Sequence, residues 1–180
     1  MPVIDLIMKE AIITEFPQFI TMTVLEWKPL LESDAYKSIV VSSLRYLVRA
    51  DRVIVFAFVI MNNHLHLVWQ LKAGQDPAAV QRDFLKYTAQ RIQKNLFQNA
   101  PGILKQYRVN ARDREYQFWQ RRSLSIELRT HAVFLQKLEY IHWNPVKAGY
   151  CRLPEEYLFS SASFYETGKT CWEFLTHYAD

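Results

Sequence analysis

The 180-residue chain contains only four glycines and two cysteines, and both shortages narrow the fold classes it can adopt. A multi-stranded sandwich or barrel needs many glycine turns, so the low glycine content argues against these architectures. Cys151 and Cys171 do not form a Cys-x-x-Cys pair, which excludes a zinc knuckle and a thioredoxin-type motif. We therefore expect two reduced thiols in a cytoplasmic protein.

Long apolar runs are also missing, because the best candidate, residues 53–61, is too short to cross a bilayer. The charged residues within positions 1–10 do not fit a secretory signal, so we expect no membrane association. Half of the residues are hydrophobic, which is enough for a core, and we expect a single domain over residues 1–180. The net charge of +4 permits nucleic acid as a partner without demonstrating it.

Hydrophobic periodicity predicts the elements of the first half of the chain. The β-branched and aromatic residues 19–27 predict a strand, and residues 34–49 predict an amphipathic helix behind a Ser-Asp cap. Residues 52–61 and 64–71 predict two strands that form a hairpin around an Asn-Asn turn.

The second half predicts two more helices and one further strand. One helix starts at Pro77, part of 116–120 is a candidate strand, and a helix capped by Thr130 is expected to end at Pro145. The order of elements corresponds to an α+β fold: a ferredoxin-like βαββαβ antiparallel sheet with helices on one face, followed by a C-terminal helix or extension.

Two histidines two residues apart lie on one of the predicted strands. Because side chains alternate between the faces of a strand, His64 and His66 point the same way and are close enough to share a metal ion. Two ligands leave a metal under-coordinated, so a third donor has to come from elsewhere. Taken alone, the pair is a weak signal, and surface or hydrogen-bonded histidines explain it better.

A tyrosine and an asparagine lie one turn apart on the third predicted helix. Tyr140 and Asn144 share a helical face, so the phenol can act as a nucleophile and the amide oxygen can be the missing ligand. The alternative is a tyrosine that packs at the domain surface and an asparagine that caps the helix before Pro145.

Three separated motifs, in order, resemble the single-tyrosine HUH transposases of the IS200-like type. They are Asn63-His64-Leu65-His66-Leu67, Phe118-Trp119-Gln120 and the segment Tyr140-Ile141-His142-Trp143-Asn144-Pro145-Val146-Lys147-Ala148-Gly149. Within that family the chain most resembles the REP-associated tyrosine transposases, over residues 19–165. Ordered motifs are far more specific than an isolated His-x-His.

The resemblance implies a role for each site residue. His64, His66 and Asn144 would bind a divalent metal, Mg²⁺ or Mn²⁺, and Tyr140 would be the catalytic nucleophile that forms a 5′-phosphotyrosine. The implied partner is single-stranded or hairpin DNA. A homodimer that shares tyrosines and a monomer are both compatible with the family.

Basic side chains interleaved with aromatic ones supply a candidate DNA-binding surface. Such a surface suits single-stranded DNA, because cations follow the backbone while aromatic rings stack on unpaired bases. A solvated charged face is the alternative. The candidates are Lys86, Arg91, Lys105, Arg108, Arg112, Arg114, Arg121 and Arg122.

The favoured interpretation is a metal-dependent single-stranded DNA endonuclease and strand transferase that acts on hairpin-associated DNA in transposition. The first alternative is a non-catalytic nucleic-acid-binding module on a ferredoxin-like sheet. The second alternative, a small metal-dependent hydrolase, lacks a general base that can be placed beside the histidines.

Overall fold

The computed structural model describes residues 16–179, and its central feature is a four-stranded antiparallel sheet. The strands are β1 (Gln18–Thr23), β2 (Val53–Ile60), β3 (His64–Leu71) and β4 (Leu124–Glu127). They lie in the order β2-β3-β1-β4, so β3 separates the two strands that are joined through a helix. This is the strand order of the predicted ferredoxin-like fold.

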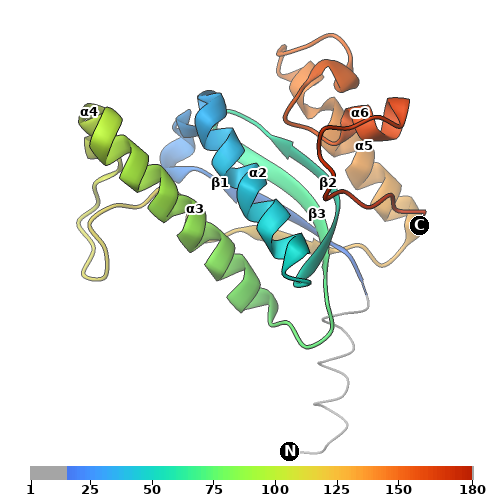
Figure 1. Ribbon diagram of the computed structural model, residues 1–180, viewed down its shortest axis with the longest axis horizontal. Coiled ribbons are helices and arrows are strands. Elements are labelled where there is room, and N and C mark those ends of the chain that lie inside the picture. Colours follow the sequence, from blue (N-terminus) through green and yellow to red (C-terminus); the bar gives the residue numbers. More distant parts are fainter. Residues whose placement is uncertain (1–15, 180) are drawn as a thin grey trace, which may run out of the picture.

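Two helices cover one face of the sheet (Figure 1). They are α2 (Asp34–Arg49), which joins β1 to β2, and α3 (Pro77–Asn99), which follows β3. Their apolar residues pack with the alternate side chains of the strands, such as Leu65 and Leu67, in the larger of two hydrophobic clusters. The helical periodicity of these two segments therefore predicted both the elements and their buried sides.

A third long helix, α5 (His131–Lys147), covers the opposite face of the sheet. Figure 1 shows it across the sheet from α2 and α3, together with the short α6 (Ala162–Thr167). Ile141 and Leu138 of α5 pack with Phe19 in a second hydrophobic cluster. This face also carries His64 and His66, so α5 lies where its polar side chains can reach them.

The structure corrects two of the expected strands. The first one ends at Thr23 rather than at residue 27, because the chain turns into a 3₁₀ segment (Leu25–Trp27). The fourth strand is β4 rather than 116–120, and in the latter segment Tyr116 and Trp119 form only isolated bridges. β4 lies at the edge of the sheet and starts with exposed residues, so its sequence lacks the apolar pattern of a buried strand.

The end of α5 also differs from the expectation. The helix passes through Pro145 and is capped at Ala148, after which Gly149 adopts a positive φ of 76°. A left-handed glycine just beyond the cap is a common helix ending. The sequence predicted an end at Pro145 because the residue before a proline avoids helical backbone angles. That local preference takes no account of tertiary packing, and Pro145 is buried within the helix.

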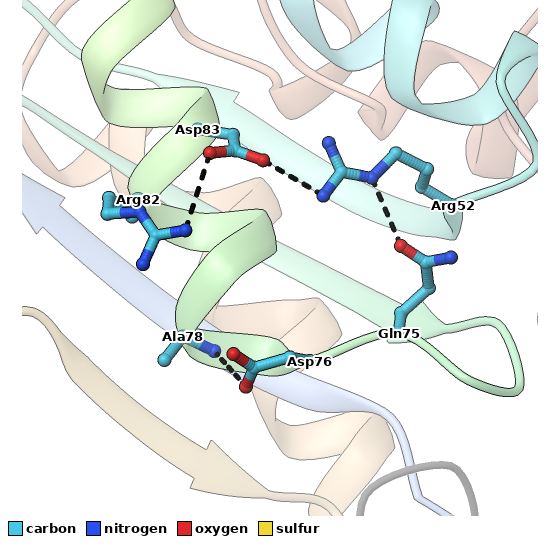
Figure 2. A network of polar contacts seen from close by, with 6 residues as sticks. All are labelled: Arg52, Gln75, Asp76, Ala78, Arg82 and Asp83. Atoms are coloured by element: carbon cyan, nitrogen blue, oxygen red, sulfur yellow. Dashed lines mark hydrogen bonds and ion pairs between the residues drawn. The ribbon is translucent and has the colours of Figure 1, made fainter.

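The start of α3 is held by a network of polar contacts (Figure 2). Asp76 caps the helix by accepting a hydrogen bond from the amide of Ala78 at 3.1 Å, and Pro77 occupies the first turn. Arg52, at the start of β2, donates to Gln75 at 3.1 Å and to Asp83 at 3.0 Å. The network ties the loop before α3 to the first strand of the hairpin.

One further short helix and three 3₁₀ segments complete the secondary structure of the described residues. The short helix α4 (Pro101–Leu104) and the 3₁₀ segment Lys105–Tyr107 follow α3, while the 3₁₀ segments Leu30–Glu32 and Pro154–Glu156 precede α2 and α6. Among the described residues, no helix combines the length and the apolar character needed to span a bilayer. Cys151 and Cys171 are both free thiols.

Candidate active site

The two histidines of β3 stand on the sheet face that α5 covers. Their ring centroids are 4.7 Å apart, as expected for residues two positions apart on a strand. Strand register places Thr23 of β1 opposite His64 and Thr21 opposite His66. The predicted common orientation of the two imidazoles is therefore present in the structure.

His66 is buried and has one ring nitrogen without a partner. Its side chain is 4% exposed, and Nδ1 lies 2.8 Å from the hydroxyl oxygen of Thr21. Nε2 is buried and makes no hydrogen bond. Burial, followed by the nearby His64 and Lys137, lowers the pKa of His66 to about 3, so the ring is neutral at pH 7. A neutral imidazole with a free nitrogen is what a metal ion requires.

His64 is oriented by the asparagine that precedes it. Asn63 donates through Nδ2 to the backbone carbonyl of Trp27 at 3.3 Å, which fixes the orientation of its amide. Asn63 Oδ1 consequently faces His64 Nδ1, at 2.7 Å, and has to accept the proton from it. This tautomer leaves the lone pair of His64 on Nε2. Burial also lowers the pKa of His64, against a smaller opposing effect of a hydrogen bond with Asn144.

Tyr140 of α5 lies beside the buried histidine. The ring centroids of Tyr140 and His66 are 5.0 Å apart, and Phe19 packs against both rings at 6.0 and 5.4 Å. Tyr140 is nevertheless 40% exposed, so a substrate can approach it.

Asn144, one turn after Tyr140, reaches the other histidine. Its side chain lies close enough to His64 to raise the pKa of that ring against the larger effect of burial, so its carboxamide is in the same site. The alternative in which Asn144 caps the helix is wrong, because α5 continues to Lys147 and its cap is Ala148. The structure thus brings together His64, His66, Tyr140 and Asn144.

The donor set fits a divalent metal through two imidazoles and one amide oxygen. Within residues 16–179, no group of three or more His, Cys, Asp and Glu side chains is placed to hold a metal ion. A third protein donor at the histidine pair is therefore not a His, Cys, Asp or Glu side chain of these residues, and the carboxamide of Asn144 lies beside His64. The unpartnered Nε2 of His66 is the observation that supports this fit.

Three residues near the site were not singled out from the sequence. Thr21 orients His66, and Trp27 approaches the ring of His64 with a centroid distance of 5.6 Å. Lys137, one turn before Tyr140, places its ammonium 5.7 Å from the Tyr140 ring centroid. The helical spacing of Lys137 and Tyr140 was a usable signal, whereas the contacts of Thr21 and Trp27 depend on the tertiary structure.

A groove runs between α3 and the segment that precedes β4. It has a volume of about 880 Å³, and its lining includes Arg82, Lys86, Arg114 and Arg121 against one acidic residue, Asp113. The indole of Trp119 donates to the hydroxyl of Thr88 on α3 at 3.0 Å, which anchors one wall. The next residue, Gln120, donates its amide to the carbonyl of Thr23, beyond which lies His64. The lining of the groove does not include the histidines, which lie on the sheet face that α5 covers.

All of the predicted DNA-binding residues are exposed, but only some of them line the groove. Asp113 pairs with Arg114 and Arg121, and Glu115 lies 3.4 Å from Arg108, so three of the cations are partly neutralised. Among residues 16–179, no ion pair is present for the other members of the predicted surface. These are Lys86, Arg91, Lys105, Arg112 and Arg122.

Comparisons with known proteins agree with the family suggested by the motifs. No family model matches the chain. A curated protein of Haemophilus influenzae, provisionally named a REP-associated tyrosine transposase, is 31% identical over 106 residues. That match covers 58% of this chain and 56% of the relative, so it spans little more than half of either protein.

A solved structure of a REP-associated tyrosine transposase bound to a REP hairpin shares the fold. It superposes with a TM-score of 0.64 at 20% identity and covers 87% of this chain and 82% of the other. The chain is similar to the REP-associated tyrosine transposases. The resemblance seen in the motifs is confirmed at this level, and the α+β architecture is confirmed by the shared fold.

Proposed function

We propose that this protein is a metal-dependent endonuclease and strand transferase for single-stranded DNA that acts beside a hairpin. The observation that carries the proposal is the approach of Tyr140 to His66, with ring centroids 5.0 Å apart and an unpartnered His66 Nε2. The similarity to a transposase whose structure contains a REP hairpin supports hairpin-associated DNA as the substrate.

Tyr140 is the nucleophile in this reaction. Its phenol oxygen loses a proton to solvent and attacks the scissile phosphorus from the side opposite the leaving group. The bond from phosphorus to the 3′-oxygen breaks, and that oxygen takes up a proton and leaves as a hydroxyl. The 5′-phosphate stays on Tyr140, so a free 3′-hydroxyl can later attack it and rejoin strands without ATP.

His64, His66 and Asn144 would hold Mg²⁺ or Mn²⁺. When bound, the cation polarises a phosphoryl oxygen and offsets the negative charge that develops in phosphoryl transfer. Burial keeps both imidazoles neutral by lowering their pKa values, and imidazole donors favour Mn²⁺ in affinity. Lys137 adds a positive charge beside the Tyr140 ring that does not depend on the metal.

The exposed basic residues are proposed to follow the DNA backbone. Lys86, Arg114 and Arg121 would place an unpaired strand in the groove beside α3. Gln120, which also lines the groove, donates its amide to Thr23, the residue opposite His64. Tyr140 and both histidines come from one chain, so a single copy brings the nucleophile and the two imidazoles together. We propose that the monomer can cleave DNA without forming a dimer. The single domain and the cytoplasmic location stay predictions.

A covalent adduct distinguishes this enzyme from a DNA-binding module. The protein is incubated with a pool of 3′-labelled hairpin oligonucleotides that carry randomised unpaired flanks, and the products are run on a denaturing gel. We expect a labelled protein band in Mn²⁺ that disappears in EDTA. Binding in a native gel without any adduct, in either Mn²⁺ or Mg²⁺, would establish the non-catalytic alternative.

A further inference from the structure

An exposed tryptophan stands at the edge of the proposed metal site. The side chain of Trp27 is 56% exposed, although its ring lies 5.6 Å from that of His64. An exposed aromatic ring that adjoins a functional site offers its face to a flat ligand such as a nucleic-acid base. Nothing in the proposed cleavage step uses this indole.

The backbone holds Trp27 in place without packing its ring. Glu26 and Trp27 have positive φ values of 56° and 58°, which non-glycine residues rarely adopt. The turn is fixed by hydrogen bonds from Trp27 N to Val24 O at 3.0 Å and from Asn63 Nδ2 to Trp27 O at 3.3 Å. A strained turn fastened on both sides thus presents an indole whose surface is largely free, which is a preorganised arrangement for stacking.

Four rings follow one another across the site. Trp27 lies next to His64, His64 next to His66, and His66 next to Tyr140, with centroid distances of 5.6, 4.7 and 5.0 Å. The proposed nucleophile and the indole are therefore at opposite ends of the histidine pair. In an in-line displacement the leaving oxygen is opposite the attacking oxygen. The nucleotide whose 3′-oxygen leaves, on the 5′ side of the cut, would therefore lie at the Trp27 end.

We propose that Trp27 is a stacking platform for the base of the nucleotide immediately 5′ of the cleaved phosphate. The position of the cut rests on the proposed function, whereas the stacking itself does not. Every base has a π-face, so an indole holds an unpaired base with little sequence preference. The metal-bound phosphate and the stacked base would together fix the strand in register with Tyr140.

Fluorescence of 2-aminopurine tests the stacking directly. A hairpin recovered from the adduct assay is synthesised with 2-aminopurine on the 5′ side or the 3′ side of the cleaved phosphate, and is bound to Tyr140→Phe protein to prevent cutting. We expect quenching on the 5′ side that is lost with Trp27→Ala and retained with Trp27→Phe. Binding by the Trp27→Ala protein should weaken about five-fold or more, and an abasic 5′ nucleotide should remove that difference.

Tyr46→Ala is the matched control, because Tyr46 is 65% exposed on α2 and lies outside the site. It should leave the quenching unchanged. Quenching that survives Trp27→Ala, or that occurs only on the 3′ side, would overturn the proposal.

If no hairpin is cut, a set of hairpins with an unpaired oligothymidine tail is used instead, each with 2-aminopurine at a different position of the tail. Trp27-dependent quenching at one of these positions would then support the platform, and none at any position would refute it.

Discussion

At the scale of the residue, the central histidines are each positioned by one polar neighbour. Thr21 contacts Nδ1 of His66 and Asn63 contacts Nδ1 of His64, so the Nε2 atoms are left to face the site. Partners of this kind set the tautomer and orientation of metal-binding histidines. The His66 ring also depends on burial, which keeps it uncharged.

Replacing Thr21 with valine removes the hydrogen bond to His66 while keeping the shape of the side chain. We expect Mn²⁺ affinity to fall about 10-fold to 100-fold, measured by the electron paramagnetic resonance signal of free Mn²⁺. Thr23→Val is the control, because Thr23 lies on the same face of β1, opposite His64. An equal loss in both variants would mean that Thr21 has no specific role.

The sequence was most informative about residues whose spacing is local. His64 and His66, and likewise Tyr140 and Asn144, are pairs whose common orientation follows from strand or helix periodicity. The contact of Thr21 with His66 requires the register between β1 and β3, which the sequence does not specify. Trp27 was assigned to a strand, because its aromatic character masked a positive φ that no local pattern signals.

At the scale of the element, α5 is the part that completes the site. Ile141 and Leu138 bury its apolar side in the second hydrophobic cluster, while Tyr140 and Asn144 face the histidines. His142 is 5% exposed and lies with Nε2 2.9 Å from the Ser161 hydroxyl, which ties α5 to the segment before α6. These contacts give His142 a structural role in the docking of α5.

The burial of His142, which docks α5, should make the free energy of unfolding fall in mild acid. Burial lowers the pKa of His142 from 6.5 to about 4, so below pH 6.5 the unfolded chain takes up a proton that the folded one does not. The contribution of His142 to the free energy of unfolding is fully present above pH 6.5. It is lost as the pH drops toward 4, which lowers the free energy of unfolding by up to about 3 kcal/mol.

Urea denaturation at pH 7 and pH 4.5 measures this effect. His142→Gln keeps an amide for Ser161 but cannot titrate, so its stability should change less between the two pH values. An unaltered pH dependence in that variant would show that His142 is not a source of the acid sensitivity.

Element prediction succeeded where packing and periodicity agree. The stripe through Val80, Phe84, Ile92 and Leu96 predicted α3, and all four side chains are buried. β4 was missed because it is a four-residue edge strand whose first two residues are exposed. The end of α5 was misplaced because tertiary packing of Pro145 outweighs the local bias against a helical residue before proline.

At the scale of the whole molecule, the sheet separates two different surfaces. One face packs against α2 and α3, and the other packs against α5 and carries the histidine site. The groove beside α3 is linked to the strand next to His64 by one backbone hydrogen bond, from Gln120 in its lining to Thr23. Composition predicted a basic protein, but which cations form one surface follows only from the three-dimensional arrangement.

The groove predicts how DNA binding depends on salt. Lys86→Gln removes a groove cation, so the slope of log affinity against log salt for an unpaired oligonucleotide should become shallower by about 0.7. Arg49→Gln is the control, because Arg49 is exposed on α2 and does not line the groove. Fluorescence anisotropy over a salt series measures both slopes, and equal slopes would contradict a DNA path through the groove.

The proposed function requires that the phenol of Tyr140 becomes covalently attached to DNA. Protein incubated with the hairpin pool and Mn²⁺ is digested with nuclease and trypsin, and the peptides are analysed by mass spectrometry. Trypsin releases residues 138–147, in which Tyr140 is the only tyrosine. We expect a nucleotide phosphate on this peptide, and none in the Tyr140→Phe protein. A nucleotide on Tyr87 or Tyr116, or an adduct that persists in Tyr140→Phe, would contradict it.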